Sequence, residues 1–186
     1  EIAELEGEQM VFNADMRSWR ELLTHIRQDF LDYSKGLSEY KPDVIRLRKD
    51  LDEGVTRTQS YVRREQLLGL AVTDYFELDG MIDDYAPYYK LWDTVIQFQQ
   101  SEIDWTNQPV KSLKSTEIEA LLDQWFKDVF KMIKAFDNPH MKNVQKVAKN
   151  LKQAIDDFKV KFPFLSAYAN ESILPRHWDQ LFERMQ

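Results

Sequence analysis

The side chains of this sequence that could bind a metal ion or transfer a proton are its histidines and its paired carboxylates. There are three histidines: His25, His140 and His177. None of them has a second histidine four residues away, and none is joined to acidic neighbours at a spacing typical of metal sites. His25 lies between apolar positions of a helical pattern, and His140 lies where a helix is expected to begin. We therefore predict no metal ligand among them.

Adjacent acidic residues occur at Asp83-Asp84 and at Asp156-Asp157. A general acid and a general base must both reach the reacting atoms of one substrate. Neighbouring residues of a helix point to different faces, so the carboxylates of each pair diverge. We interpret both pairs as solvated or helix-starting residues and predict no catalytic residue in this chain.

Glycine-rich and thiol chemistry are also missing. A phosphate-binding loop needs several closely spaced glycines followed by Lys-Ser or Lys-Thr, whereas the five glycines of this chain are isolated. We therefore predict no cofactor-binding residue. The chain has no cysteine, which excludes disulfides and thiolate catalysis and fits a cytosolic protein.

Five tryptophans could suggest a surface for a ligand or a carbohydrate. Trp19, Trp92 and Trp125 lie on apolar stripes of helical patterns, so packing in a core is the better interpretation for these three. Trp105 and Trp178 lie near the ends of predicted elements, and the pattern does not decide their role.

The net charge of −7 argues against a nucleic-acid partner, which requires a concentrated basic surface. The dense basic stretches, at 46–49 and 142–152, are interleaved with apolar residues at helical spacing, and we interpret them as solvated helix faces. No run of about 18 apolar residues exists, so no transmembrane helix and no membrane partner are expected. The sequence shows no signal peptide.

Apolar residues recur at helical spacing through the first third of the chain. The first series alternates steps of four and three, at Phe12, Met16, Trp19, Leu23, Ile26, Phe30 and Tyr33. This heptad seam predicts a helix from about Glu4 to Tyr33, with Gly36 as its stop. Pro42 suits the first turn of the next pattern, which continues as one or two helices to about Gly80.

The middle of the chain predicts an aromatic helix that starts near Asp83-Asp84, has Pro87 in its first turn and ends before the loop 107–109. Thr116 and Glu119 have the spacing of a capping box, which predicts a helix from there to Phe136.

Asn138-Pro139 then opens a helix that Pro163 breaks. A second seam lies on this helix, at Val144, Ala148, Leu151, Ile155, Phe158 and Phe162. A short helix at 165–170 and a last helix from Pro175 to Gln186 complete the pattern.

These patterns predict an all-α fold, an elongated bundle of about six or seven helices with heptad-like seams. A heptad seam can build an intermolecular coiled coil or an internal bundle. We favour the internal bundle, because wide apolar stripes elsewhere supply partners within the chain. The sequence begins without Met and ends inside a helical pattern, so we expect it to be cut from a longer protein.

An ordered set of motifs resembles the dynein heavy chain family over about residues 44–186. The upstream motifs are Glu65-Gln66-Leu67-Leu68-Gly69-Leu70, then Tyr75, Leu78, Leu91-Trp92, Trp105 and Trp125. The downstream motifs are Phe162-Pro163-Phe164-Leu165 and Arg176-His177-Trp178, followed by an amphipathic stretch. The segment 88–93 with Phe98 is more similar to axonemal dyneins than to cytoplasmic ones. The family usually has a Lys or Arg near the position of Leu174-Pro175, and we expect the proline here to start the last helix and not to continue one.

The resemblance implies a tail-to-linker segment of an ATP-driven microtubule motor, with residues 1–110 as a helical tail segment and 111–186 leading into the linker. ATP and magnesium would bind in a downstream ring, so the segment itself would hold no cofactor and catalyse nothing. Its implied partners are the rest of the heavy chain and other dynein subunits, in the cytoplasm and cytoskeleton of a ciliary or flagellar axoneme.

Two other functions remain open from the residues alone. A spectrin-like or tether-like helical interaction module would show the same periodicities as a force-transmitting segment. A helical enzyme domain is disfavoured by the absence of chemical motifs. The flanking sequence distinguishes the first two, because a motor would continue into a linker and six ATPase modules.

The seam on the helix 139–162 gives a direct test of packing. If Leu151, Ile155 and Phe158 hold two helices in register, Ile155→Ala should lower the free energy of unfolding by about 2–5 kcal/mol, since it leaves a cavity in a core. Thermal unfolding followed by circular dichroism measures the change. A melting temperature equal to that of the parent chain would contradict the packing.

Overall fold

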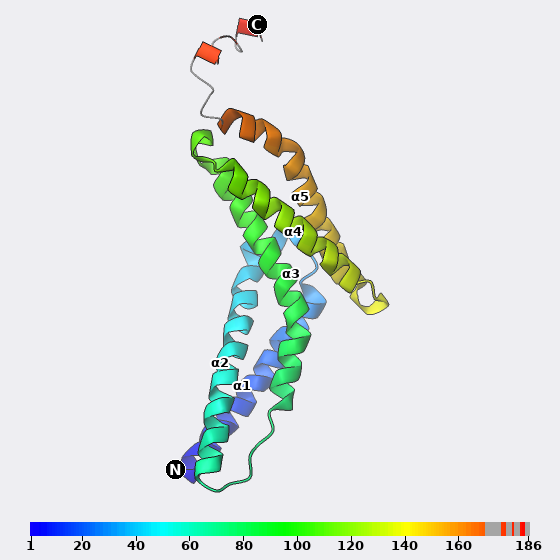
Figure 1. Ribbon diagram of the computed structural model, residues 1–186. Coiled ribbons are helices and arrows are strands. Elements are labelled where there is room, and N and C mark those ends of the chain that lie inside the picture. Colours follow the sequence, from blue (N-terminus) through cyan, green and yellow to red (C-terminus); the bar gives the residue numbers. More distant parts are fainter. Residues whose placement is uncertain (170–175, 178–179, 181–182, 185–186) are drawn as a thin grey trace. The chain divides into compact units, whose positions relative to one another are not determined.

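The computed structural model describes residues 1–169, 176–177, 180 and 183–184, and this part of the chain is helical without a strand (Figure 1). Short 3₁₀- and π-helical turns connect the α-helices, except at 68–75, where the connection is not helical. The five α-helices are α1 (Ile2–Asp29), α2 (Lys41–Leu67), α3 (Phe76–Asn107), α4 (Ser115–Ala135) and α5 (Lys142–Ala169). The chain divides into two compact units, residues 1–96 and 97–186, and the boundary falls within α3.

The helix α1 buries the first apolar series of the sequence. Its inward residues are Leu5, Phe12, Met16, Trp19, Leu23 and Ile26. The helix ends at Asp29, earlier than predicted, and Phe30 leaves the helical conformation with ψ of 77°. The Asp32 side chain then accepts a hydrogen bond from the Ser34 N–H at 3.0 Å and holds a 3₁₀ turn, an alternative to continuing the helix. Gly36 is not the stop; it is buried with helical φ of −51° in the π-helical turn η2 (Gly36–Tyr40).

The helix α2 ends at Leu67, so the predicted end near Gly80 is wrong. Gly69 adopts φ of +69°, which only glycine tolerates easily. Its N–H donates to the Gln66 carbonyl at 3.2 Å, and the Leu70 N–H donates to the Glu65 carbonyl at 2.9 Å. This pair of bonds is the Schellman motif, which ends a helix by satisfying its last carbonyls.

The helix α3 starts before the predicted Asp83-Asp84 site. The Asp74 carboxylate accepts a hydrogen bond from the Phe76 N–H at 3.1 Å and so satisfies one of the first free donors of the helix. Pro87 consequently lies in the helix interior and not in the first turn. Its neighbours Tyr85 and Tyr88 are buried, and their burial holds the chain helical despite the missing N–H of the proline.

In residues 1–96, the helices α1, α2 and the first part of α3 share one core. The Tyr85 hydroxyl donates to the Val44 carbonyl at 2.7 Å, which joins α3 to α2. Gly54 of α2 lies under the Trp19 ring of α1, so close that an added Cβ would lie 2.9 Å from the ring and 3.3 Å from Leu78 of α3. This glycine therefore sets how closely the three helices approach.

In residues 97–169, the last part of α3 packs with α4 and α5. The Phe98 ring lies edge-on to Trp125 of α4 and to Phe158 of α5, with centroids 5.8 and 6.2 Å apart. Leu151 and Ile155 of α5 are fully buried, as the sequence pattern predicted.

One predicted cap and one predicted helix end in this region are wrong, although α4 itself begins and ends within one residue of the prediction. The Lys114 N-cap of α4 makes no side-chain cap hydrogen bond, and Thr116 is exposed inside the helix, so the predicted capping box is absent. Pro163 does not break α5, which continues to Ala169 because Phe162 and Ala169 are buried on either side of the proline. The Asn138 side chain does accept a hydrogen bond from the His140 N–H at 3.0 Å, as an opening cap should.

The predicted number of six or seven helices is not confirmed. The described residues contain five α-helices, and residues 165–169 of the expected short helix form the end of α5. Most of the expected last helix, 175–186, lies outside the described residues. The predicted division at 110/111 falls in the 3₁₀ turn η3 (Val110–Ser112), and its functional meaning stays a prediction.

The contact of Gly54 with Trp19 predicts that replacing Gly54 and Gly80 by alanine changes the free energy of unfolding in opposite directions. Gly54→Ala should lower the free energy of unfolding by about 1–3 kcal/mol, because the rigid ring must move. Gly80→Ala, where nothing lies within 4 Å of an added Cβ, should raise it by about 0.5–1 kcal/mol through the lower chain entropy of alanine. Urea unfolding of both variants measures the difference, and equal stability of the two variants would contradict the close approach.

Candidate functional site

Among the described residues, no histidine belongs to a cluster of possible metal ligands. The His25 Nδ1 lies 2.6 Å from the Asp29 carboxylate, and both side chains are exposed at the end of α1. His140 lies in the exposed 3₁₀ turn η4 (Pro139–Met141). In the described residues, no three His, Cys, Asp or Glu side chains are placed so that they could hold a metal ion.

The adjacent carboxylates diverge. Asp84 lies 3.6 Å from Arg27 of α1. In the second pair, Asp156 accepts a hydrogen bond from Lys152 at 2.7 Å, and Asp157 accepts one from Gln153 at 2.8 Å. Each carboxylate of that pair thus has its own partner, as the helical spacing predicted.

The three tryptophans assigned to the core are buried, with 8% of Trp19, 1% of Trp92 and 7% of Trp125 exposed. The half-buried Trp105 packs against the rings of Trp125 and Phe158, with centroids 6.0 and 5.2 Å away. It therefore also serves packing. Trp178 lies outside the described residues.

Glu65 is the buried carboxylate of residues 1–96, with 3% of its surface exposed near the end of α2. Its Oε1 accepts hydrogen bonds from the Gln9 amide at 2.7 Å and from the Thr73 hydroxyl at 2.6 Å. Its Oε2 accepts one from the Thr73 N–H at 2.9 Å. The Gln9 amide also donates to the Tyr75 hydroxyl at 3.0 Å. The network joins α1, α2 and the connection to α3.

Local sequence explains how these groups meet. Gly69 turns the chain back at the end of α2, so that Thr73 returns beside Glu65, eight residues earlier. On α1, Phe12 lies one turn from Gln9 and meets the rings of Tyr61 and Tyr75 edge-on, each with centroids 5.7 Å apart. The aromatic contacts thus hold α1 against the connection between α2 and α3, and the hydrogen bonds of Glu65 fix that connection in place.

The electrostatics of Glu65 favour its charged form. Burial by itself raises the pKa of the Glu65 carboxyl, but the hydrogen bonds from Thr73 and Gln9 outweigh burial and hold the pKa below its ordinary value of 4.5. Three of the roughly four lone-pair sites of this carboxylate accept hydrogen bonds from within the chain, and the side chain is buried away from any substrate. The site is therefore suited to fixing a loop and not to acid–base catalysis.

The groove between α1 and α2 in residues 1–96 is not lined by a cluster of catalytic groups either. This groove of about 370 Å³ is lined by Trp19 and by charged residues of both signs. The ion pair of Arg57 and Asp15, at 2.7 Å, lies at its wall. Opposite charges satisfy each other there.

Sequence reasoning missed the Glu65 network, although Glu65 and Gly69 both lie in the motif quoted for the resemblance. The usable signal was Gly69 directly after a leucine pair, which is the pattern of a helix end. The partners of Glu65 lie 56 and 8 residues away, so no local pattern reveals its burial.

Comparison with known proteins then decides the family. The family described as "Dynein heavy chain, N-terminal region 2" matches residues 78–186, more than half of the chain. The chain belongs to the dynein heavy chain family. The match covers the second part of the stretch on which the motifs suggested this family, and it confirms that resemblance.

Curated dynein heavy chains resemble the sequence over most of its length. Dynein axonemal heavy chain 1 of Rattus norvegicus is 29% identical over 143 residues, 77% of this chain and 3% of that protein. Dynein axonemal heavy chain 3 of Homo sapiens is 28% identical over 137 residues, 74% of this chain and 3% of that protein. Dynein axonemal heavy chain 12 of Homo sapiens is 26% identical over 161 residues, 84% of this chain and 5% of that protein.

This dynein heavy chain segment therefore spans only 3–5% of the length of these relatives. The relatives carry axonemal names, in line with the axonemal character of the aromatic segment 88–93. No solved structure matches the sequence significantly. Within the described part of this dynein segment, no helix is long and apolar enough to cross a membrane.

The Glu65 network predicts a pH-dependent loss of stability. Because the folded pKa lies below the ordinary value of 4.5, the carboxylate contributes its full stability above that pH and loses it as pH falls through the folded pKa. Glu65→Gln should lower the free energy of unfolding at pH 7 by about 1–3 kcal/mol, since an amide cannot accept all these hydrogen bonds.

Urea unfolding at pH 7 and at pH 3 measures both effects, and the difference between the parent and Glu65→Gln should shrink at pH 3. The matched control is Glu53→Gln, which changes an exposed carboxylate of the same helix and should leave stability unaltered. A difference that stays the same at both pH values would contradict the role of the charged carboxylate.

Proposed function

We propose that this chain is a non-catalytic tail-to-linker segment of an axonemal dynein heavy chain and that it transmits force between the tail and the motor. The family match over residues 78–186 carries the proposal. ATP and magnesium would be used by a ring elsewhere in the parent chain, which would be an ATP-driven microtubule motor. The segment would hold no cofactor of its own.

The internal packing supports a mechanical role, because force passes only through contacts that do not yield. In residues 1–96, ion pairs join α1 to both other helices: Arg64 lies 2.6 Å from Glu8, and Arg20 lies 3.0 Å from Glu77. In residues 97–169, fully buried Ile155 and the aromatic contacts of Phe158 hold α4, α5 and the end of α3 together. Close packing of this kind resists small displacements.

The family supports a proposal for the partners and the location. The rest of the heavy chain is the first partner, and other dynein subunits would contact exposed helix faces. The axonemal relatives support a place in the axoneme of a cilium or flagellum. A helical interaction module that binds protein partners is the alternative, and the exposed lysines of α4 and α5 favour it.

Gliding of microtubules over the full-length heavy chain tests the mechanical role. Ile155→Ala weakens the packing of α4 against α5, so we expect slower gliding while ATP turnover by the ring stays unchanged. The control is Val160→Ala, five residues along the same helix, where the side chain is 72% exposed and gliding should keep its parent velocity.

The alternative gives a different result in the same preparations. If the segment acts as an interaction module, Ile155→Ala would reduce the dynein subunits that co-purify with the heavy chain and leave the gliding velocity of the remaining motors unchanged. That outcome would overturn the force-transmitting role.

A further inference from the structure

Arginine predominates among the basic residues of the first unit, whereas lysine predominates in the second unit, whose two arginines are Arg176 and Arg184. Residues 1–96 contain eight arginines and four lysines, whereas residues 97–169 contain eleven lysines and no arginine. Against these, residues 1–96 have twenty acidic residues and residues 97–169 have nine. The first unit is therefore acidic, and the described part of the second unit carries an excess of lysine.

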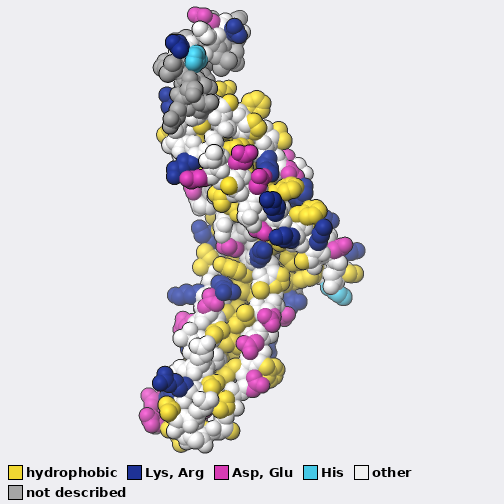
Figure 2. Space-filling view, viewed as in Figure 1, with side chains coloured by type: hydrophobic (Ala, Val, Ile, Leu, Met, Phe, Trp, Pro, Cys, Tyr) yellow, Lys and Arg dark blue, Asp and Glu magenta, His cyan; other side chains and the backbone are white. Residues whose placement is uncertain are grey.

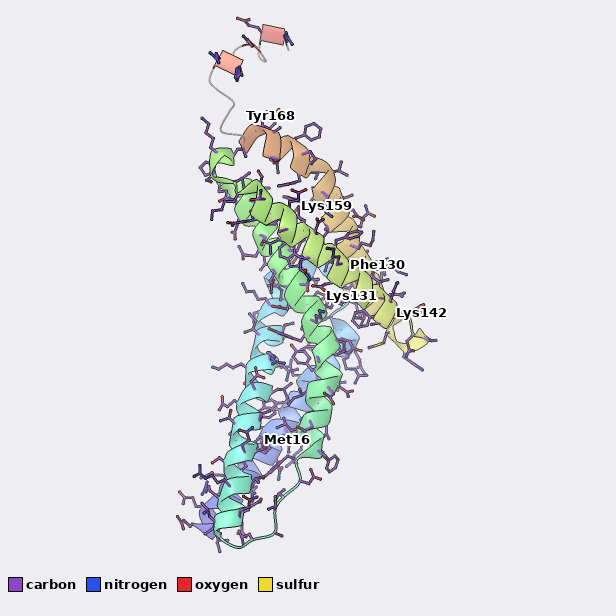
Figure 3. The ribbon with its side chains drawn as sticks, in the orientation of Figure 1. Met16, Phe130, Lys131, Lys142, Lys159 and Tyr168 are labelled. Atoms are coloured by element: carbon purple, nitrogen blue, oxygen red, sulfur yellow. The ribbon has the colours of Figure 1, made fainter. Side chains whose placement is uncertain are left out.

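The excess of lysine gathers around the turn between α4 and α5. Figure 2 shows lysine side chains and apolar side chains side by side on the face that these helices present. We define the basic hairpin surface by the exposed side chains Phe130, Lys131, Lys134, Lys142, Lys146 and Lys149. Figure 3 shows Phe130 and Lys131 on α4 and Lys142 at the start of α5, near the turn.

Side-chain contacts place both helices on this one surface. The Gln145 amide of α5 donates to the Ile133 carbonyl of α4 at 3.0 Å, while its Oε1 accepts from Lys149 at 3.0 Å. The Lys134 ammonium lies 4.6 Å from the centroid of the Phe130 ring. Since Lys142, Lys146 and Lys149 follow one another at helical spacing, they continue the same face of α5.

The charges of the basic hairpin surface are not neutralised within the described residues. None of its five lysines forms an ion pair with a carboxylate there, and its Phe130 ring is 47% exposed. Farther along α5 the lysines are paired: Lys152 lies 2.7 Å from Asp156, and Lys159 lies 2.5 Å from Asp123. These two ion pairs mark where the basic hairpin surface ends along α5.

The placement of Lys142 and Lys146 also opposes the stability of α5. Both lie in the first two turns of the helix, at the positive end of its dipole, and the first turn has no acidic residue. Positive charge there destabilises a helix, and residues that break such a local rule commonly serve binding. Folding alone therefore does not account for these lysines.

We propose that the basic hairpin surface binds an acidic protein segment, a run of Asp or Glu carboxylates with one apolar side chain that packs on Phe130. Charge complementarity carries the choice of partner. Lysine acts as a hydrated point charge on a flexible stem, so it suits carboxylates whose positions vary along a peptide. The net charge of −7 of the whole chain disfavours a long polyanion such as nucleic acid. One exposed phenyl ring offers too little apolar area for insertion into a lipid surface. The inference is independent of the proposed force transmission.

Fluorescence anisotropy with a labelled glutamate peptide that has one central leucine tests the proposal on the whole chain. Lys142→Glu with Lys146→Glu should weaken binding about tenfold or more, because reversed rim charges repel the peptide. The matched control is Lys111→Glu with Lys161→Glu, which changes the net charge equally at exposed lysines outside the surface and should leave affinity within about threefold. Replacing the leucine of the peptide by serine should also weaken binding.

Thermal unfolding separates loss of binding from loss of fold. Because glutamate is favourable at the start of a helix, Lys142→Glu with Lys146→Glu should keep or raise the melting temperature while binding is lost. Equal weakening by both double variants would overturn the proposal, since only net charge would then matter. Tighter binding of duplex DNA or of phosphatidylserine vesicles than of the peptide at the same salt concentration would overturn it as well.

Discussion

The close approach of the Trp19 ring to the backbone of α2 at Gly54 sets the spacing of the three helices in residues 1–96. At Gly54 the ring of Trp19 occupies the space that any side chain would need, and Leu78 of α3 lies against the same point. The residues at a helix contact set the separation of the axes. The edge-on contacts of Phe12 with three other rings and the hydrogen bond from Tyr85 to the Val44 carbonyl are made at the separation that this contact allows.

The two units use charge in different ways. In residues 1–96, arginines form ion pairs between helices: the partly buried Arg57 meets Asp15, and the exposed Arg27 lies 3.6 Å from Asp84. The Glu65 carboxylate is likewise consumed by donors from α1 and from the loop before α3. In residues 97–169, the core is held by aromatic contacts, and the lysines of the basic hairpin surface stay in solvent. Charged groups of the first unit thus link its helices, whereas the lysines of the basic hairpin surface in the second unit can still bind a partner.

Helical periodicity predicted the residues of the core well. Phe12, Met16, Trp19, Leu23 and Ile26 are all buried, and so are Leu151 and Ile155, because side-chain direction repeats with the turn of the helix. The family could also be inferred from the sequence, because short motifs spread over several helices occur in the order typical of dynein heavy chains. Periodicity could not predict the burial of Glu65 or the close approach of Trp19 to Gly54, since both depend on residues far away in the chain.

Helix ends were predicted less well, and each error has a local cause. Gly69 was passed over for Gly80, although only the former takes a left-handed backbone conformation. Pro87 and Pro163 were expected at a start and at a break, yet buried neighbours on both sides keep each within a helix. The free energy of burial outweighs the cost of one missing hydrogen bond, a balance that local preferences do not contain.

The same two prolines make the long helices mechanically uneven. A helix resists bending through its ladder of hydrogen bonds, and each proline removes one rung, at the carbonyl four residues before it. In α3 that carbonyl belongs to Asp83, and in α5 it belongs to Lys159. Since one hydrogen bond of the ladder is missing at each of these two positions, we expect each helix to bend more easily there than elsewhere along its length.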